Sequence, residues 1–306
     1  MKSAGRDDTI PIAETPWEGG DRVAHIRDHM IRIRGDVARP PDGSVVVPVN
    51  AQGDLGTVLA LLADIGEYQG AHSFEVILVI NNFAPDRPPV EVERYADAKL
   101  RIVAIPSVLR PGYAPALCAR MEGARVADAE PILLFDADCR IPSVTPLFDW
   151  YVAQLTTGAT AAYTPVDHHD LPPDVSLHVR IRLHHAARWV KRNLFRIPTT
   201  RGSNYAIART PVLALYDQGL IADEMNVGPV VKASGARVAY SGNHDLRVLT
   251  SARRLPGGWR RLIRYAVIRL RYNLRVLPVR QDAARHTGRA DVPRSVAAPD
   301  IDDPDR

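Results

Sequence analysis

The clearest chemical signal in the sequence is an apolar run, residues 131–135, that ends in Asp136-Ala137-Asp138. Consecutive apolar residues of this kind are typical of a strand buried on both faces of a parallel sheet. The two carboxylates then fall at the carboxyl end of that strand, where open α/β sheets bind their ligands. Because unpaired carboxylates are costly to bury, they need a cation, and a hard divalent ion that also holds phosphate oxygens is the natural one. The pattern indicates a metal–phosphate site, although a solvated loop after a strand would look the same.

Strand and helix patterns alternate along the chain around this site. β-branched and apolar runs predict strands at residues 44–49, 74–80, 100–105, 131–135 and 159–164. Helical spacing of apolar residues predicts helices at residues 54–65, 113–127, 144–155 and 223–234, with Asp54 as the N-cap of the first. This alternation predicts an α/β fold, a Rossmann-like, doubly wound, mostly parallel sheet with helices on both faces.

Four other local signals occur in a fixed order with the aspartate pair. They are the strand ends Val46-Val47-Pro48-Val49-Asn50 and Val79-Ile80-Asn81-Asn82-Phe83-Ala84-Pro85-Asp86, the turn Arg201-Gly202-Ser203-Asn204-Tyr205-Ala206, and the pair Asp223-Glu224 on a helix that closes at Gly235. This order and spacing resemble the family 2 glycosyltransferases, which have the GT-A fold. The resemblance covers about residues 44–260. It departs from the family at Asn81, where an aspartate is common, and in the acidic pair, which is more often Glu-Asp.

The resemblance implies a hexosyltransferase-like enzyme. It would move a sugar, with inversion, from a nucleoside diphosphate sugar, UDP-linked in our expectation, to a hydroxyl acceptor. The departing diphosphate needs a Lewis acid, and Mg²⁺ or Mn²⁺ fits oxygen ligands. By the resemblance, Asp138 holds this metal, and Asp136 lies close to the ribose or to a metal-bound water. His244 is a further candidate ligand, although a lone histidine is more often structural or exposed.

The acidic pair on the last predicted helix is the candidate catalytic base. An acceptor hydroxyl is a poor nucleophile and needs a carboxylate that takes its proton during the attack. By register with Gly235, Glu224 lies where the family places this base, and Asp223 is its neighbour. Both residues stay open as the base. Asp223 also has an ordinary alternative role as a helix N-cap, which the helix dipole favours.

A wider set of residues is expected, by the resemblance, to bind the nucleotide sugar. It comprises Pro48, Asn50, Asn82, Asp86, Gly112, Asp136, Ala137, Gly202, Asn204, Arg253 and Arg254. The glycines would let the backbone approach the ligand, and the two arginines, on a Gly-bounded segment, would clamp the diphosphate. The asparagines, Gly112 and Asp86 also suit simple turns and loop caps, and the arginines also suit a solvated basic loop.

Two further segments are rich in basic residues. Residues 165–200 are irregular, and we expect an acceptor-side loop or lid with a basic helix. Adjacent histidines point in different directions, so neither His168-His169 nor His184-His185 forms a metal site alone. The helical stretch 259–277 interleaves apolar residues with arginines. It would contact an anionic membrane surface or, as we favour, pack on the domain.

Composition and charge narrow the class of protein. The 306 residues are 46% apolar and 24% charged, as in an ordinary globular protein. A net charge of +4 permits an anionic ligand and does not demand nucleic acid. Two cysteines are too few for a disulfide framework, and the first residues are polar. We therefore expect a cytoplasmic protein, at most peripheral at the inner membrane face.

The same patterns suggest how the chain is divided. We expect residues 1–43 to form an N-terminal extension and residues 44–278 to form the GT-A domain. Within that domain, residues 44–140 would be the nucleotide-binding half and residues 141–278 the acceptor half. Residues 279–306 are polar, with several Pro and Asp, and are expected to be a disordered tail.

Three other classes of protein compete with this interpretation. Haloacid dehalogenase-type phosphatases carry Asp-x-Asp after their first strand, whereas three predicted strands precede it here. Sugar-phosphate nucleotidyltransferases usually need a Gly-rich loop with a basic residue after the first strand, which Ala51-Gln52-Gly53-Asp54 lacks. A non-catalytic nucleotide-sugar-binding protein would keep the fold alone. The metal hypothesis itself fails if the aspartates lie far from a cleft or beside a buried basic group that already satisfies them.

Overall fold

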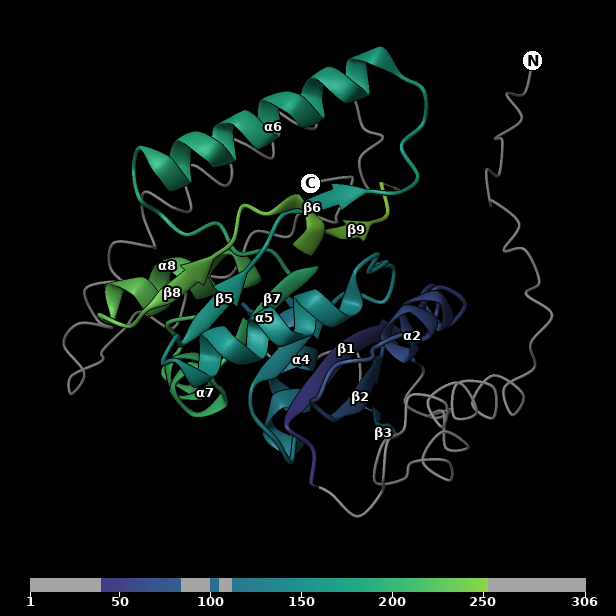
Figure 1. Ribbon diagram of the computed structural model, residues 1–306, viewed down its shortest axis with the longest axis vertical. Helices are drawn as coiled ribbons and strands as arrows, with labels where there is room; N and C mark the ends of the chain where they lie inside the picture. The colour runs from purple at the N-terminus through teal and green to yellow at the C-terminus, as the bar shows by residue number, and fades with distance from the viewer. Residues whose placement is uncertain (1–39, 84–99, 105–111, 253–306) are drawn as a thin grey trace, which may run out of the picture.

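The computed structural model describes residues 40–83, 100–104 and 112–252 of the chain (Figure 1). Its strands are β1 (Gly43–Asn50), β2 (Phe74–Asn81), β3 (Leu100–Ala104), β4 (Ile132–Phe135), β5 (Ala161–Tyr163), β6 (Val166–His168), β7 (Asn204–Ile207), β8 (Val238–Tyr240) and β9 (Val248–Thr250). Within the described residues, seven strands form one sheet in the order β3-β2-β1-β4-β7-β5-β8, and β6 pairs with β9 in a second sheet. Each strand that the sequence predicts is present.

The large sheet is parallel in the half that the N-terminal strands form. β1 pairs in parallel with β2 and with β4, and β2 pairs in parallel with β3. β7 runs antiparallel to both β4 and β5, and β8 is again parallel to β5. The predicted mostly parallel α/β sheet is therefore confirmed, with β7 as an inserted antiparallel strand.

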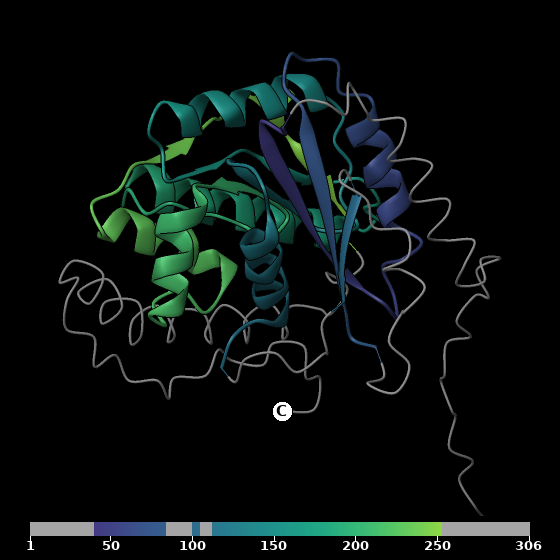
Figure 2. The ribbon, with the colours of Figure 1, turned by 90° about the horizontal axis from the view of Figure 1, so that it is seen from below.

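Helices cover both faces of this sheet, as predicted (Figures 1 and 2). They are α2 (Val58–Gly66), α4 (Pro115–Val126), α5 (Val144–Thr156), α7 (Arg209–Asp217) and α8 (Glu224–Ala233). α2 and α5 pack in one apolar cluster with Val45 and Val47 of β1, whereas α4, α7 and α8 pack in the other with Val46. Because successive side chains of a strand point to opposite faces, a continuous apolar run such as residues 45–49 of β1 is buried on both sides.

The irregular basic segment contains a further helix, α6 (Val175–Asn193). Asp174 caps this helix, because its side chain accepts a hydrogen bond from the backbone N–H of Ser176 at 2.8 Å. α6 lies on the side of the molecule where β6 and β9 pair, apart from the helices that cover the large sheet (Figure 1). None of the helices in the described part of the chain combines the length and the apolar character needed to cross a membrane.

The first helix begins later than the sequence predicts. α2 starts at Val58, and Thr57 rather than Asp54 occupies the N-cap position. The carboxylate of Asp54 instead accepts a hydrogen bond of 3.2 Å from the backbone N–H of Asn50. The prediction of Asp54 as an N-cap is wrong, because a turn over residues 51–57 lies between β1 and α2 and uses that carboxylate.

Several predictions concern residues outside the described ranges. They are the N-terminal extension up to residue 39, Asp86, Arg253, Arg254, the stretch 259–277 and the tail 279–306. The domain limits and the roles of these residues stay predictions.

Candidate functional site

Asp136 and Asp138 lie where β4 ends, as the sequence predicts. The backbone N–H of Cys139 donates to the carbonyl oxygen of Asp136 at 3.1 Å, which closes a tight turn. The possible ligand atoms of Asp136, Asp138 and Cys139 all lie within 4.8 Å of one another. This turn, the aspartate turn, therefore brings two carboxylates together at the carboxyl edge of the parallel strands.

Cys139 is the least available of these three possible ligands. Its side chain is fully buried, and its Sγ donates to the carbonyl oxygen of Ser203 at 3.3 Å. Burial and the charges of Asp136 and Asp138 raise the pKa of the Cys139 thiol well above its ordinary value. A protonated thiol is a poor metal ligand and a poor nucleophile, so Cys139 packs against the turn and the two carboxylates are the better candidates for ligands.

The small β6–β9 sheet packs against the aspartate turn. The hydroxyl of Thr250, in β9, donates to the Asp138 carboxylate at 3.2 Å. The ring Nε2 of His169, which directly follows β6, lies 3.2 Å from the carbonyl oxygen of Asp138. A backbone bridge between Arg140 and Leu249 continues this contact. Residues far along the chain therefore hold Asp138 in place.

A buried arginine that the sequence analysis does not predict connects the two acidic parts of the site. The side chain of Arg120, in α4, is 1% exposed and forms ion pairs with Asp136 and Glu224. Its Nη1 donates to Oε1 of Glu224 at 2.6 Å, and its Nη2 donates to Oδ1 of Asp136. The signal in the sequence is that Arg120 lies on the same helix face as Leu117, Met121 and Ala124, which are buried. This signal is weak, because an arginine on a helix normally extends into water.

Burial and charge act in opposite directions on this arginine. Burial alone would lower the pKa of Arg120, but the carboxylates of Asp136 and Glu224 raise it above its ordinary value. The guanidinium therefore stays charged and is a permanent cation between two acids. Breaking such a buried pair is strongly destabilising, because the remaining charge has no partner.

Glu224 has the property expected of a base that works near neutral pH. Burial raises the pKa of its carboxyl, Arg120 lowers it, and the charge of Asp223 raises it again, with a net result of about 7. The side chain is only 13% exposed, so the loss of water outweighs the single ion pair. At neutral pH a substantial fraction of the carboxyl is ionised and able to accept a proton.

Asp223 and Glu224 have different positions at the start of α8. The carboxylate of Asp223 accepts a hydrogen bond of 2.8 Å from the backbone N–H of Met225, so the N-cap alternative is confirmed. The hydroxyl of Thr200 donates to the carbonyl oxygen of Glu224 at 2.9 Å and accepts from the N–H of Gly228 at 3.1 Å. These contacts hold the first turn of α8 and direct Glu224 towards Arg120. Of the two acids, Glu224 is better placed to act as a base.

Gly202 lies against the guanidinium of Arg120. A Cβ atom at this position would lie 3.1 Å from Nη2 of Arg120 and 3.3 Å from Nη1. Both nitrogens are held by ion pairs and have little freedom to move away. Gly202 therefore gives the room that the arginine needs, a function that the prediction of a sugar-pocket glycine did not include.

The ends of β1 and β2 are tied together by asparagines. Oδ1 of Asn50 accepts hydrogen bonds from the backbone N–H of Gln52 at 2.9 Å and from Nδ2 of Asn82 at 3.1 Å. Asn82 has a positive φ of 58°, a conformation that asparagine tolerates better than most residues. Asn50 therefore does cap the loop, as its ordinary alternative supposes. A contact of Asn50 or Asn82 with a nucleotide stays a prediction.

The other residues predicted to bind the nucleotide sugar differ in their surroundings. Pro48 is buried within β1, and Ala137 is 3% exposed at the centre of the aspartate turn. Gly112 has a φ of 80° just before α4, which explains the need for glycine there. Direct contact between these residues and a ligand stays a prediction.

Asn204 is not placed as predicted. We expected it to line the sugar pocket, but it is 1% exposed and lies at the start of β7. Its Oδ1 accepts from the hydroxyl of Tyr151, and its Nδ2 donates to Oγ1 of Thr164 at 2.5 Å and to the carbonyl oxygen of Pro165 at 3.3 Å. The amide is thus used inside the protein, because β7 runs between β4 and β5 and carries Asn204 into the core. The prediction for Asn204 is corrected to a structural role.

His244 is also not placed as predicted. It begins the short helix η1 (His244–Leu246) and is exposed. Within the described residues, the group of possible ligand atoms at the aspartate turn contains Asp136, Asp138 and Cys139, and His244 does not belong to it. The carboxylate–histidine set that the sequence suggests is therefore not assembled, because His244 lies instead within electrostatic reach of His185, where its charge helps to lower the pKa of that ring.

The residues at the aspartate turn fit a hard divalent cation, with one restriction. Carboxylate oxygens are the ligands that Mg²⁺ and Mn²⁺ prefer. Arg120 already pairs with Oδ1 of Asp136, so the condition that we set against the metal hypothesis is met in part at this residue. The Asp136 side chain is still 36% exposed, and the Asp138 carboxylate accepts from the neutral hydroxyl of Thr250. Asp138, and Asp136 through its other oxygen, can therefore both offer a ligand atom to such a cation.

Comparisons with known proteins give a distant likeness in structure. The sequence matches no protein-family model and no curated protein. A mannosyltransferase from Pyrobaculum calidifontis in complex with GDP-Man and Mn²⁺ is similar at a TM-score of 0.48 and 17% identity, over 89% of this chain and 77% of that one. Glucosyl-3-phosphoglycerate synthase from Mycobacterium tuberculosis, in complex with Mn²⁺, UDP and glucosyl-3-phosphoglycerate, is similar at 0.42 and 16% identity, over 88% and 85%. Values this low do not transfer an activity, so the function has to be argued from the residues of this chain.

Proposed function

We propose that this protein is a metal-dependent, inverting glycosyltransferase that moves a sugar from a nucleoside diphosphate sugar, UDP-linked in our expectation, to a hydroxyl acceptor. The observation that carries the proposal is the linkage of two acidic parts through one buried cation. Arg120 pairs with Asp136 of the aspartate turn and, at 2.6 Å, with Glu224 of α8. A leaving-group site and a base held at a fixed separation are what transfer to a hydroxyl requires.

The aspartate turn would hold the donor. Asp138, with Asp136 beside it, offers carboxylate oxygens to Mg²⁺ or Mn²⁺, which when bound supplies the positive charge that a departing diphosphate needs. Asn50 and Asn82, at the ends of β1 and β2, lie along the same edge of the sheet and would bind the nucleotide. The carboxyl edge of a parallel sheet is the usual place for such a ligand.

Glu224 would accept the proton of the acceptor hydroxyl during the attack. Burial raises the pKa of this carboxyl to about 7, so it is ionised in part at neutral pH and holds a proton more readily than an exposed carboxylate would. A base of this kind is efficient when its pKa lies near the working pH. A single base on the face opposite the leaving group would give inversion at the sugar carbon.

Arg120 would act as a positioning residue. Its two ion pairs hold the carboxylates of Glu224 and Asp136 in one orientation. They would therefore fix the distance between the proposed base and the donor site. Gly202 allows this arrangement by leaving space for the guanidinium.

A second candidate function is a nucleotide-sugar-binding protein without catalysis. One observation favours it: the Arg120 cation already engages Asp136 and Glu224, so neither acid needs a ligand for its charge to be balanced. Such a protein would bind the donor and transfer nothing.

The two functions are separated by donor binding and turnover measured on the same protein. Thermal-shift screening of nucleoside diphosphate sugars, with and without Mn²⁺, identifies the donor, because a ligand that binds only the native state raises the melting temperature. Transfer or slow hydrolysis of that donor, lost in Asp138→Asn and kept in the exposed control Asp245→Asn, supports the glycosyltransferase. Donor binding without turnover, in the presence of Mg²⁺ or Mn²⁺, would support the non-catalytic binding protein. If no donor binds, both candidate functions are contradicted.

A further inference from the structure

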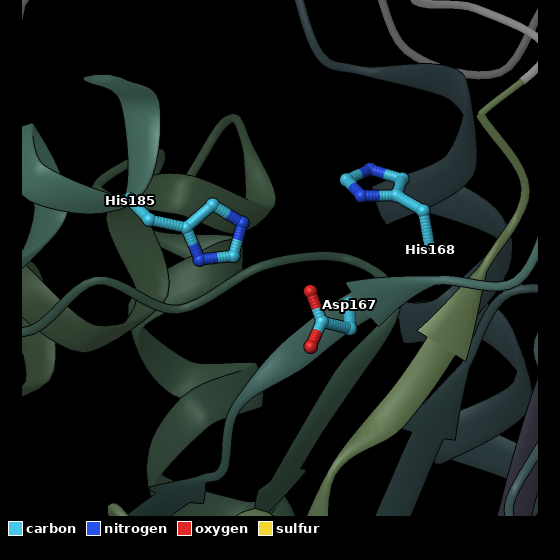
Figure 3. A group of neighbouring side chains, drawn as sticks. All are labelled: Asp167, His168 and His185. Atoms are coloured by element: carbon cyan, nitrogen blue, oxygen red, sulfur yellow. The ribbon is translucent and has the colours of Figure 1, made fainter. Parts of the chain in front are cut away.

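A second group of possible metal ligands lies next to the aspartate turn and shares no residue with it. Asp167 and His168 come from β6 and His185 comes from α6, and their ligand atoms all lie within 4.8 Å of one another. Figure 3 shows the carboxylate of Asp167 and the two imidazole rings facing a common space. Each of the two adjacent histidine pairs in the sequence thus contributes one ring, which explains why neither pair is sufficient alone.

Two atoms of this group are buried without a hydrogen-bond partner. They are Nδ1 of His168 and Nε2 of His185, among the buried side-chain atoms of the described residues. Buried polar atoms are nearly always paired in folded proteins, so such an atom needs an explanation. Two imidazole nitrogens without partners, beside one carboxylate, are explained by an ion that would bind all three.

The rings are in the protonation state that binds metals. Burial, together with the charge of Arg201, lowers the pKa of His168 to about 4 and also lowers the pKa of His185. Both imidazoles are therefore neutral at physiological pH, and their lone pairs are available for coordination. Arg201 also repels a cation, but this screened repulsion is weak beside coordination bonds, and Asp167 opposes it with a negative charge.

We propose that Asp167, His168 and His185 form a binding site for a zinc-class transition-metal ion, separate from the carboxylate site at the aspartate turn. Two imidazoles and one carboxylate are a common ligand set for Zn²⁺, with a fourth position open to water or another ligand. Mg²⁺ is excluded as the natural occupant because it prefers oxygen ligands. The site would join α6 to β6, whose next residue, His169, contacts the carbonyl oxygen of Asp138.

Cobalt binding tests this site directly. Co²⁺ substitutes for Zn²⁺, and its visible bands are intense only at the low coordination number that zinc sites have. We expect the full chain to bind one equivalent of Co²⁺ with intense visible bands that Zn²⁺ displaces. The variants His185→Gln and Asp167→Asn should weaken this binding at least tenfold. The matched control is His178→Gln, an exposed histidine on the same helix, which should bind as the wild type does.

A second variant separates this site from the aspartate turn. Asp138→Asn should keep the visible bands, because Asp138 is not a member of the histidine group. Loss of the bands in Asp138→Asn would assign the metal to the aspartate turn and overturn the proposal. Unchanged binding in both His185→Gln and Asp167→Asn, or no binding to the wild type, would also overturn it.

Two further measurements guard against the effects of unfolded variants. Circular dichroism without metal checks that each variant is folded, and NMR on the wild-type protein needs no substitution. In wild-type protein with labelled histidines, Zn²⁺ should shift the imidazole NMR signals of His168 and His185 and leave that of His178 in place. Shifts confined to other histidines would contradict the assignment whatever the variants do.

Discussion

The carboxylate of Glu224, at the start of α8, accepts a hydrogen bond of 2.6 Å from the guanidinium of Arg120 in α4. The same guanidinium pairs with Asp136 in the turn after β4. One buried cation therefore sets the relative positions of the proposed donor site and the proposed base. Substitutions around it separate contributions to stability from contributions to chemistry.

Loss of the Arg120 charge should destabilise the protein strongly. Arg120→Met leaves Asp136 and Glu224 without their buried cation, and breaking such a pair costs about 3–5 kcal/mol. The control on the same helix is Arg125→Met, since Arg125 is 37% exposed and pairs with Asp217 at the surface. That change should cost less than about 1 kcal/mol. Urea unfolding at pH 7.5 measures the free energy of unfolding of both variants. Equal decreases in the two variants would show that the Arg120 ion pairs contribute little to stability.

A methyl group at Gly202 should disturb the same ion pairs. Its Cβ would lie 3.1 Å from Nη2 of Arg120, whose position is held by two carboxylates. We expect Gly202→Ala to lower the free energy of unfolding by about 1–3 kcal/mol, as overpacking does. Gly53→Ala is the control, because nothing lies within 4 Å of the added Cβ at that position. Thermal unfolding compares the two, and a wild-type melting temperature for Gly202→Ala would contradict the tight fit.

Removal of the proposed base should abolish transfer and leave the donor bound. Glu224→Gln keeps the shape of the side chain but cannot accept a proton, and a positioned base contributes about 10²–10⁴ in rate. We therefore expect kcat to fall by this factor while the Kd of the donor stays within about twofold. Glu67→Gln, at an exposed position after α2, is the control. A near-normal rate for Glu224→Gln would move the role of base to another residue.

The kcat/KM of transfer should fall on the acidic side of its pH profile, which is called the acidic limb below. The base acts when ionised, and its pKa is raised to about 7, chiefly by burial. Below about pH 7, kcat/KM should fall about tenfold per pH unit as Glu224 becomes protonated. In Asp223→Asn the limb should move to lower pH, because the Asp223 charge helps to raise this pKa. Asparagine still caps the helix, so the start of α8 should persist. A limb that does not move would exclude this coupling.

The corrected role of Asn204 predicts a loss of stability. Asn204→Ala leaves the hydroxyl of Tyr151 without its buried partner, and unsatisfied buried groups cost about 1–3 kcal/mol. The hydroxyl of Thr164 loses one hydrogen bond and keeps the one that it donates to the carbonyl oxygen of Leu246. Asn193→Ala removes one exposed hydrogen bond, to the carbonyl oxygen of Trp189, and should cost much less. Chemical unfolding compares the variants. Weaker donor binding by Asn204→Ala with unchanged stability would restore the predicted place in the sugar pocket.

Much of the fold follows from local patterns. The runs of β1, β2 and β4 are mostly apolar, with Ser44 and Glu75 as buried polar exceptions, a pattern typical of strands covered on both faces. The local pattern predicts too early a start for α2, because Asp54 suits both a helix N-cap and a turn, and only its contact with Asn50 distinguishes the two. Local sequence thus predicts elements well and their ends less well.

Short-range periodicity and residue type are enough to predict the central parallel strands, the acidic turn after β4 and the acidic start of α8. Which side chains meet depends on how these elements pack against one another. The antiparallel insertion of β7 buries Asn204, and the packing of α4 against the sheet brings Arg120 between Asp136 and Glu224. These pairings join residues far apart in the chain, and a buried charge reveals its partner only when packing has removed the water between them.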